Sequence, residues 1–263
     1  MGFGALRLEH LRTELEDGVA WIRLARPPVN ALTAAMVDAL AEAVREAAAD
    51  PAVRVAALAS DVPGQFSAGL DVRELASADA ALMARLDAAF KDGIVAPLRA
   101  SRRLFCAVIE GNCFGGGLEL ALACDLRIGS RGAWRAGLPE VRLGGMPGGG
   151  GIQLLARLAG SSRAARVALL GETFGPEDAH AWGVLDALVD DGGAARALVA
   201  RLAGGPTEAY AAIKLALRAA SGTPLADALV LERELYRALA ATADLGEGLR
   251  AFGEKRAPRF EGR

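Results

Sequence analysis

Two stretches of the sequence combine glycine residues with the expected start of a helix. In the first, an apolar run at residues 104–109 leads into Gly115, Gly116 and Gly117, and residues 118–124 suit a buried helix. Amide groups at a helix N-terminus are unpaired and carry partial positive charge, so this turn could bind an anion. A tight packing point between strand and helix explains a glycine triplet equally well.

The second stretch is the loop of small residues at 66–71, which precedes another expected helix start. A backbone N–H near Leu70 and another near Gly116 could converge on a single oxygen atom. Paired amides of this kind form an oxyanion hole, in which removal of one donor costs about 10²–10³ in rate. Backbone donors leave no side-chain signature, so spacing alone does not prove the arrangement.

Two glutamates lie near these glycine-rich turns. Glu119 falls in the first turn of the helix after the triplet, and Glu140 follows Pro139. Carboxyl groups can serve as acids and bases in catalysis, although a glutamate in the first turn of a helix is more often a surface residue favoured by the helix dipole. Both also have a structural explanation, because acidic residues and prolines are favoured in the first turn of a helix.

The length, amino-acid composition and net charge indicate what general class of protein this is. The 263 residues suffice for one large domain, or for one domain with an appendage. Hydrophobic residues make up 52%, charged residues 24%, and the net charge is −2. We therefore expect a soluble globular protein that binds neither nucleic acid nor an anionic membrane. The apolar runs are too short to span a bilayer and no signal peptide is visible, which predicts a cytoplasmic location.

The residues that usually bind metals or form disulfides are few. Cys106, Cys113 and Cys124 are an odd number without C-x-x-C spacing, which predicts buried free thiols. The only histidines are His10 and His180, so neither a metal site nor a Ser-His-Asp triad is expected. The glycine-rich loop at 144–151 matches neither a P-loop nor a G-x-G-x-x-G motif, so no nucleotide site of those kinds is predicted.

The periodicity of apolar residues predicts mixed α and β structure followed by helices alone. The composition becomes wholly helical near residue 200, so we divide the chain into residues 1–200 and 201–263. Expected strands lie at 6–14, 19–24, 53–58 and 184–189, with a hairpin turn at 16–18. Expected helices include one that ends before residue 50, a long one at 78–98, and others at 151–158, 162–170 and 176–182.

Taken together, several motifs are similar to the enoyl-CoA hydratase/isomerase family, the crotonase superfamily. The resemblance extends over nearly the whole chain and rests on residues 26–32, 66–71, 115–125, 138–148, 177–186 and 247–256. It implies an α/β fold of the ClpP/crotonase type, a spiral of β-β-α units, in residues 1–200. It also implies that the helical region 201–263 mediates trimerisation, giving a homotrimer or a homohexamer built from two trimers.

The resemblance further implies an acyl-CoA substrate, with coenzyme A as part of the substrate and no separate cofactor. The thioester carbonyl would accept hydrogen bonds from the amides of Leu70 and Gly116. Ala68, Asp71 and Val72, together with these two residues, would line the path of the thioester and of coenzyme A. Leu70 is bulkier than the alanine usual at its position, although only its N–H is needed.

Two residues of the C-terminal tail are also candidates for binding coenzyme A. Phe252 and Lys255 could reach its adenine and phosphates, in the same subunit or in a neighbouring one, and a solvated tail is the alternative. Phe90 and Trp134 are candidates for shaping the acyl pocket, although aromatic residues at such positions commonly belong to the core.

In the hydratases of this family two glutamates flank the reacting carbons, and Glu119 and Glu140 are the matching positions. We assign Glu140 as the main proton donor and acceptor, and Glu119 as the residue that positions water. A free glutamate titrates near about 4.3, so burial or the charge of its partner must raise the pKa of a proton donor.

The function implied is that of an enoyl-CoA hydratase, a hydro-lyase that adds water across a 2,3-double bond through an enolate. The alternatives are an enoyl-CoA isomerase or an acyl-CoA hydrolase of the same superfamily, or a non-catalytic scaffold subunit that binds coenzyme A.

Overall fold

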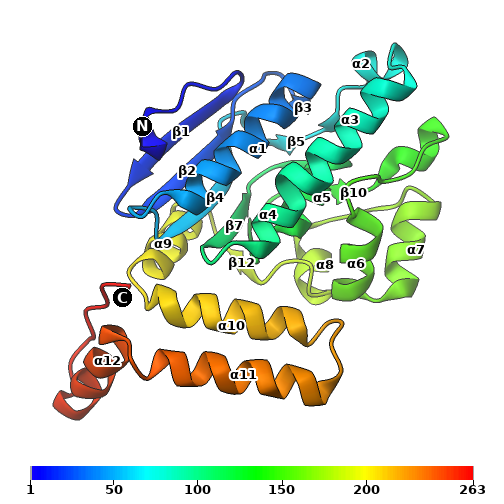
Figure 1. Ribbon diagram of the computed structural model, residues 1–263. Helices are drawn as coiled ribbons and strands as arrows, with labels where there is room; N and C mark the ends of the chain where they lie inside the picture. Colours follow the sequence, from blue (N-terminus) through cyan, green and yellow to red (C-terminus); the bar gives the residue numbers. More distant parts are fainter. Residues whose placement is uncertain (1, 263) are drawn as a thin grey trace.

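The computed structural model describes residues 2–262, which fold around a large six-stranded sheet (Figure 1). The strand order is β1-β2-β4-β7-β9-β12. β1 and β2 form the predicted antiparallel hairpin, and the other neighbouring strands are parallel. The strands span Leu11–Glu16 (β1), Val19–Leu24 (β2), Val55–Ser60 (β4), Leu104–Ile109 (β7), Leu126–Ser130 (β9) and Ala187–Val189 (β12).

A short strand follows three of the long strands and lies in a smaller sheet of order β11-β10-β8-β5. β5 follows β4, β8 follows β7 and β10 follows β9, and helices follow β8 and β10. The strand-strand-helix repeat implied by the family resemblance is thus present. The short strands span Gln65–Ser67 (β5), Asn112–Phe114 (β8), Ala136–Gly137 (β10) and Thr173–Phe174 (β11), and a separate parallel pair joins Ala31–Leu32 (β3) to Gly69–Leu70 (β6).

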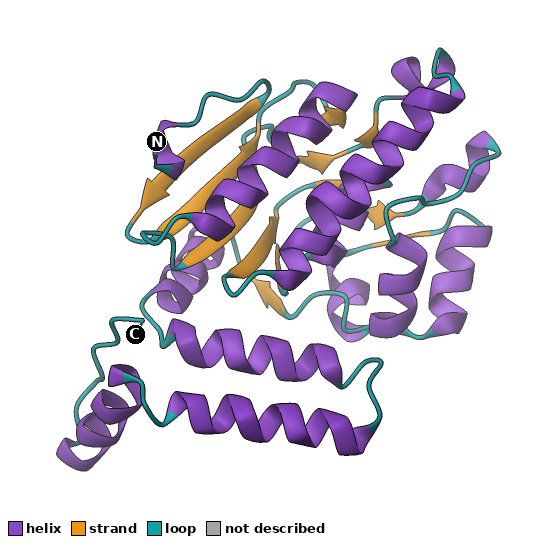
Figure 2. Ribbon diagram, in the orientation of Figure 1, coloured by secondary structure: helices purple, strands orange, loops and turns teal. Residues whose placement is uncertain are grey.

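Different helices cover the two faces of the large sheet. Helix α1, Ala34–Ala49, packs in one core with Ile22 and Leu58, while α9, Gly192–Ala203, packs in a second core with Trp21. Neighbouring residues of β2 therefore belong to opposite faces, as expected of a strand buried on both sides. Figure 2 shows α1 crossing the near face of the sheet.

Helix α5, Gly116–Ala123, is buried along its whole length, and Glu119 is its only charged residue. An apolar helix can be buried on all sides, whereas a buried carboxyl group needs hydrogen bonds or a change of pKa. Other helical segments of this part of the chain are Phe3–Ala5 (η1), Val72–Ala76 (α2), Pro139–Leu143 (η3), Gly151–Ala159 (α6), Ser161–Leu169 (α7) and Pro176–Ala181 (α8). Nothing in the described part of the chain forms a helix both long and apolar enough to cross a bilayer.

The segment predicted as one helix at 78–98 is divided. Helix α3, Ala80–Phe90, passes into a π turn, η2, at Lys91–Val95, and then into α4, Ala96–Ala100. Pro97 lies at the start of α4 and has no N–H to donate to the preceding turn, which explains the local change of helix type. The first predicted strand is also shorter, because His10 has a φ of +59° and β1 begins only after it.

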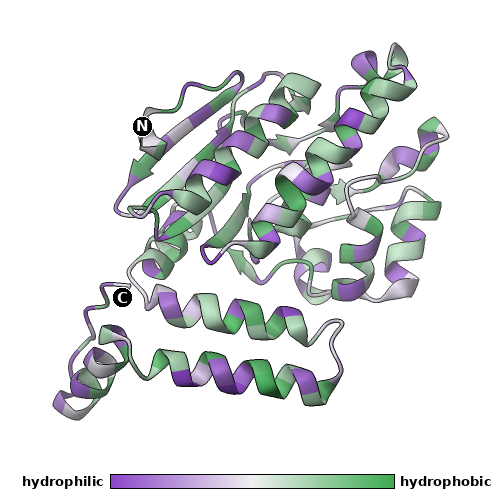
Figure 3. Ribbon diagram, in the orientation of Figure 1, coloured by the Kyte–Doolittle hydropathy of each residue, from purple (hydrophilic) through white to green (hydrophobic). Residues whose placement is uncertain are grey.

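The last part of the chain is helical and extends away from the sheets (Figure 1). It consists of α10 (Thr207–Ala219), α11 (Leu225–Leu239) and α12 (Ala243–Glu254). No residue of α11 is buried, and apolar and polar segments alternate along α10 and α11 (Figure 3). Large apolar side chains are exposed on all three helices, among them Ile213, Leu217, Leu225, Leu229, Val230, Tyr236, Leu249 and Phe252.

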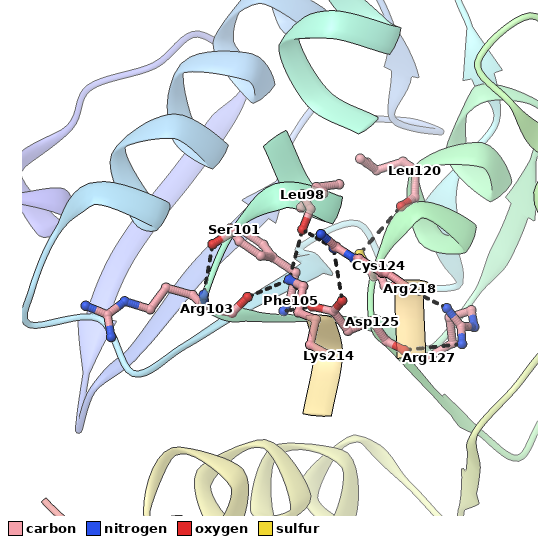
Figure 4. A network of polar contacts seen from close by, with 10 residues as sticks. All are labelled: Leu98, Ser101, Arg103, Phe105, Leu120, Cys124, Asp125, Arg127, Lys214 and Arg218. Atoms are coloured by element: carbon pink, nitrogen blue, oxygen red, sulfur yellow. Dashed lines mark hydrogen bonds and ion pairs between the residues drawn. The ribbon is translucent and has the colours of Figure 1, made fainter. Parts of the chain in front are cut away.

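A buried ion pair joins α10 to the centre of the fold (Figure 4). The Lys214 ammonium lies 2.6 Å from Asp125 Oδ2 and donates to the carbonyl groups of Leu98, at 2.9 Å, and Arg103, at 2.7 Å. These contacts use all three of its N–H donors. Asp125 also accepts the Phe105 N–H at 2.8 Å. Burial lowers the pKa of Lys214 and raises the pKa of Asp125, while their mutual attraction opposes both shifts.

We predict that Lys214→Ala lowers the free energy of unfolding by about 3–5 kcal/mol, because Asp125 would be left buried without its main partner. Urea unfolding followed by circular dichroism measures this change. Arg85→Ala is the matched control, since Arg85 pairs with Asp38 at a site where both side chains are about half exposed and such pairs contribute little. An equal loss of free energy of unfolding in Lys214→Ala and Arg85→Ala would contradict the prediction.

Candidate active site

The loop that carries Leu70 lies directly against the glycine turn at the start of α5. A side-chain carbon added to Gly69 would come within 3.1 Å of the Gly116 nitrogen, and one added to Gly116 would lie 3.6 Å from the Leu70 nitrogen. Gly69 and Gly115 have φ values of +90° and +51°, which favour glycine. The two backbone segments selected from the sequence are therefore neighbours.

The direction of the Leu70 amide follows from the pairing of β3 with β6. The Asp71 N–H donates to the Leu32 carbonyl at 2.9 Å. Successive amides of a strand point to opposite edges, so the Leu70 N–H points away from β3 and toward α5. Gly116 is the first residue of α5, and the first amides of a helix have no acceptor within that helix. Two donors thus border the same small space.

Glu119 is held one helical turn beyond this space. Its side chain is 3% exposed, and Oε1 accepts the amides of Gly149 at 2.7 Å and Gly151 at 2.9 Å. Burial raises the pKa of Glu119, while these two hydrogen bonds and the charge of Lys91 oppose the shift. Both hydrogen bonds go to Oε1, and neither goes to Oε2.

Glu140 approaches the glycine turn from η3. Its Oε1 lies 2.9 Å from the point that a side-chain carbon on Gly115 would occupy, next to the Gly116 amide. Its Oε2 is buried and accepts no hydrogen bond from the residues that the structure describes. Burial, with a smaller contribution from the negative charge of Glu119, raises the pKa of Glu140 to about 7. A carboxyl group with this pKa can both donate and accept a proton near neutral pH.

Amino-acid sequence comparison assigns the chain to a known family. The model of the family described as enoyl-CoA hydratase/isomerase matches residues 14–263. This match covers nearly the whole chain, including both glycine turns and both glutamates. The chain belongs to the enoyl-CoA hydratase/isomerase family.

Individual relatives cover the chain almost completely. The 2,3-dehydroadipyl-CoA hydratase of Escherichia coli (strain K12) is 35% identical over 260 residues, which is 97% of this chain and 100% of the relative. The mitochondrial methylglutaconyl-CoA hydratase of Homo sapiens is 34% identical over 270 residues, covering 98% of this chain and 77% of the relative.

Solved structures of the family share the fold. An enoyl-CoA hydratase from Geobacillus kaustophilus HTA426 superposes with a TM-score of 0.92 at 36% identity, over 98% of each chain. DspI of Pseudomonas aeruginosa superposes with a TM-score of 0.90 at 32% identity, over 98% of this chain and 99% of that one. The α/β crotonase fold expected from the sequence is confirmed.

The residues predicted to line the substrate path next to Leu70 differ in their surroundings. Ala68 and Val72 are exposed. Asp71 caps α2 by accepting the Arg73 amide at 3.0 Å, and it pairs with Arg26 at 2.9 Å. The Arg73 amide and then Arg26 lower the pKa of Asp71. Asp71 is thus a charged residue that also fixes the turn after Leu70, and its contact with coenzyme A stays a prediction.

Phe252 and Lys255 are not brought to the glycine turns within one chain. Both are exposed, Phe252 to 86%, and they lie in or directly after α12. Figure 1 shows α12 at the opposite end of the molecule from α2 and α3. Their predicted role toward coenzyme A therefore requires a neighbouring subunit.

The glycine run at 148–151 supplies the two amides that hold Glu119, a role that the sequence does not predict. Of the two aromatic residues that the sequence offers as candidates for the acyl pocket, one lies at this place. Phe90 packs against Gly149 beside Glu119. Trp134, the other aromatic candidate, instead donates to the Ser130 carbonyl at 2.8 Å and packs against Gly129, so it belongs to the core.

We predict that Glu140 makes stability depend on pH. Its pKa is about 7 in the folded protein against an ordinary value of 4.5, so folding favours the protonated form. Its contribution is fully present below pH 4.5 and is lost as the pH rises through about 7. Relative to Glu140→Gln, the wild type should therefore lose free energy of unfolding over this interval. Denaturant unfolding of both proteins at a series of pH values tests this, and parallel profiles would contradict it.

Proposed function

We propose that the protein is an enoyl-CoA hydratase, which adds water across the 2,3-double bond of an acyl-CoA thioester. The observation that carries this proposal is the meeting of the Leu70 and Gly116 backbone segments beside two carboxyl groups, the buried one of Glu119 and the half-buried one of Glu140. Relatives named as hydratases of enoyl-CoA, 2,3-dehydroadipyl-CoA and methylglutaconyl-CoA support the same reaction class.

In the proposed reaction, the two amides hold the thioester oxygen. Water attacks the β-carbon, and the electrons of the double bond move to that oxygen, where the paired N–H groups stabilise the enolate. The enolate then takes a proton at the α-carbon from Glu140. Glu119 orients the attacking water through Oε2. The proton that water loses passes to the carboxylate of Glu119 and from there to Glu140, which restores the starting protonation state of the pair.

Coenzyme A enters this proposal as part of the substrate, and no separate cofactor is required. Ala68 and Val72 are exposed beside Leu70, where a long substituent on the thioester would leave the site. The guanidinium of Arg26 also lies near this exit, where it is paired with Asp71 at 2.9 Å.

We further propose that the protein is a homotrimer, or a hexamer of two trimers, whose subunits meet through the C-terminal helices. Helix α11 buries none of its residues within its own chain, although Leu225, Leu229, Val230 and Tyr236 are large and apolar. Exposed apolar surface of this extent is typical of an interface. Such an assembly would also bring Phe252 and Lys255 of one subunit toward another.

Double-bond isomerisation is the second candidate reaction. One observation favours it: Oε1 of Glu119 is tied to two amides, whereas Oε2 of Glu140 accepts no hydrogen bond from the described residues, and burial raises the pKa of Glu140 to about 7. A single carboxyl group that moves a proton between two carbons would suffice for isomerisation. Product masses separate the reactions, because hydration adds the mass of water and isomerisation leaves the mass unchanged.

We predict that Glu119→Gln and Glu140→Gln each lower kcat for hydration of crotonyl-CoA by about 10²–10⁴, since each removes a proton-transfer or water-orienting group. Loss of the absorbance of the conjugated thioester follows the reaction. Glu9→Gln, at an exposed glutamate, is the matched control and should equal wild type. Unchanged hydration in Glu119→Gln would exclude the two-carboxylate mechanism.

A further inference from the structure

Phe90 lies beside Glu119, the residue that orients water in the proposed mechanism. It is the last residue of α3 and is 5% exposed. A side-chain carbon placed on Gly149 would meet ring atoms Cδ1 and Cε1 of Phe90 at 2.5 Å and Glu119 Oε2 at 2.8 Å. The aromatic ring and Oε2 of Glu119 therefore adjoin the same point.

The ring of Phe90 is held firmly in place. The π turn η2 begins at the next residue, Lys91, and a π turn redirects the side chains around it. Leu86, one turn earlier, and Ile94, one turn later, are 6% and 0% exposed. On its other side the ring packs against Gly149, whose amide is fixed by its hydrogen bond to Glu119. Close packing on these sides leaves the ring little room to move away from a ligand.

The position of Phe90 limits the space for the acyl chain. With the thioester oxygen at the Leu70 and Gly116 amides, the α- and β-carbons lie between Glu140 and Glu119. Carbons beyond the β-carbon must continue away from the amides and past Glu119. The ring of Phe90 and the backbone of Gly149 adjoin Oε2 of Glu119, so they face a chain that continues past this carboxyl group.

We propose that Phe90 closes the acyl end of the site and is a specificity-determining residue, restricting the enzyme to short-chain 2-enoyl thioesters. This inference rests on the proposed hydratase function and adds the substrate class to it. A longer acyl chain would have to displace a buried aromatic ring or leave the site by another route. Each methylene that a pocket cannot accommodate changes kcat/KM by about tenfold or more.

The test is a comparison of kcat/KM for hydration of four-, six- and ten-carbon 2-enoyl-CoA thioesters. For the wild type we expect the ten-carbon substrate to react at least about tenfold less efficiently than the four-carbon one. Phe90→Ala should raise the ratio of ten-carbon to four-carbon efficiency by about tenfold. Phe90→Trp should act in the opposite direction and lower the ratio of six-carbon to four-carbon efficiency.

Phe105→Ala is the matched control, because it removes an equally buried phenylalanine whose ring lies 5.6 Å from the Lys214 ammonium instead of beside Glu119. The Phe105→Ala variant should lose thermal stability but keep the wild-type ratios of kcat/KM between the ten-, six- and four-carbon substrates. If Phe90→Ala does not fold, Phe90→Leu tests the same direction with a smaller cavity.

Two results would overturn the inference while leaving the hydratase proposal intact. One is a wild type that hydrates ten-carbon and four-carbon substrates with equal efficiency. The other is an unchanged ratio in a folded Phe90→Ala or Phe90→Leu variant. A wild type that hydrates none of the three thioesters would instead overturn the proposed function itself, and this inference with it.

Discussion

The close approach of two backbone segments, residues 64–70 and 111–117, is the constraint on which the site depends. A side-chain carbon on Gly111 would lie 2.1 Å from the Gly64 carbonyl carbon, one on Gly117 would lie 2.6 Å from the Ser67 side chain, and one on Gly69 would lie 3.0 Å from the Phe114 oxygen. Only glycine permits contacts this short. They bring the loop before α2 against the N-terminus of α5, so that two amides from distant parts of the chain share one space.

The electrostatics of the site follow from where these segments place two carboxyl groups. Glu119 lies inside a buried helix and is compensated by two amides at the N-terminus of α6, those of Gly149 and Gly151. Glu140 reaches the same region from η3, and its Oε2 finds no such partner in the described residues. Similar side chains thus have different surroundings, which is a common way for one site to provide two carboxyl groups with different roles.

Much of this arrangement could be predicted from the sequence, and the reasons for the failures are physical. The long buried strands, the hairpin at 16–18 and α5 have clear patterns of apolar residues and turns. Strands of two or three residues, such as β6 and β10, are too short to show a periodicity. The π turn after Phe90 gave no signal, because apolar spacing continues through it. The contact between Gly149 and Glu119 joins residues that only the folded chain brings together.

The resemblance to a family supplied the residue roles, whereas the structure supplied the surroundings that make those roles physically reasonable. The pKa of Glu140 near 7 depends on burial, which no sequence pattern reports. The Lys214–Asp125 pair likewise joins α10 to the end of α5, two segments that are separated in the sequence by everything from β9 to α9. Long-range contacts of this kind are set by tertiary packing.

Vibrational spectroscopy of a bound thioester tests the central claim most directly. The infrared stretch of a ¹³C-labelled enoyl-CoA carbonyl reports how strongly hydrogen bonds polarise that group. If the Leu70 and Gly116 amides both donate to the thioester oxygen, the stretch should shift to lower frequency on binding than in water. A carbonyl frequency in the complex equal to that of the free thioester would contradict the account.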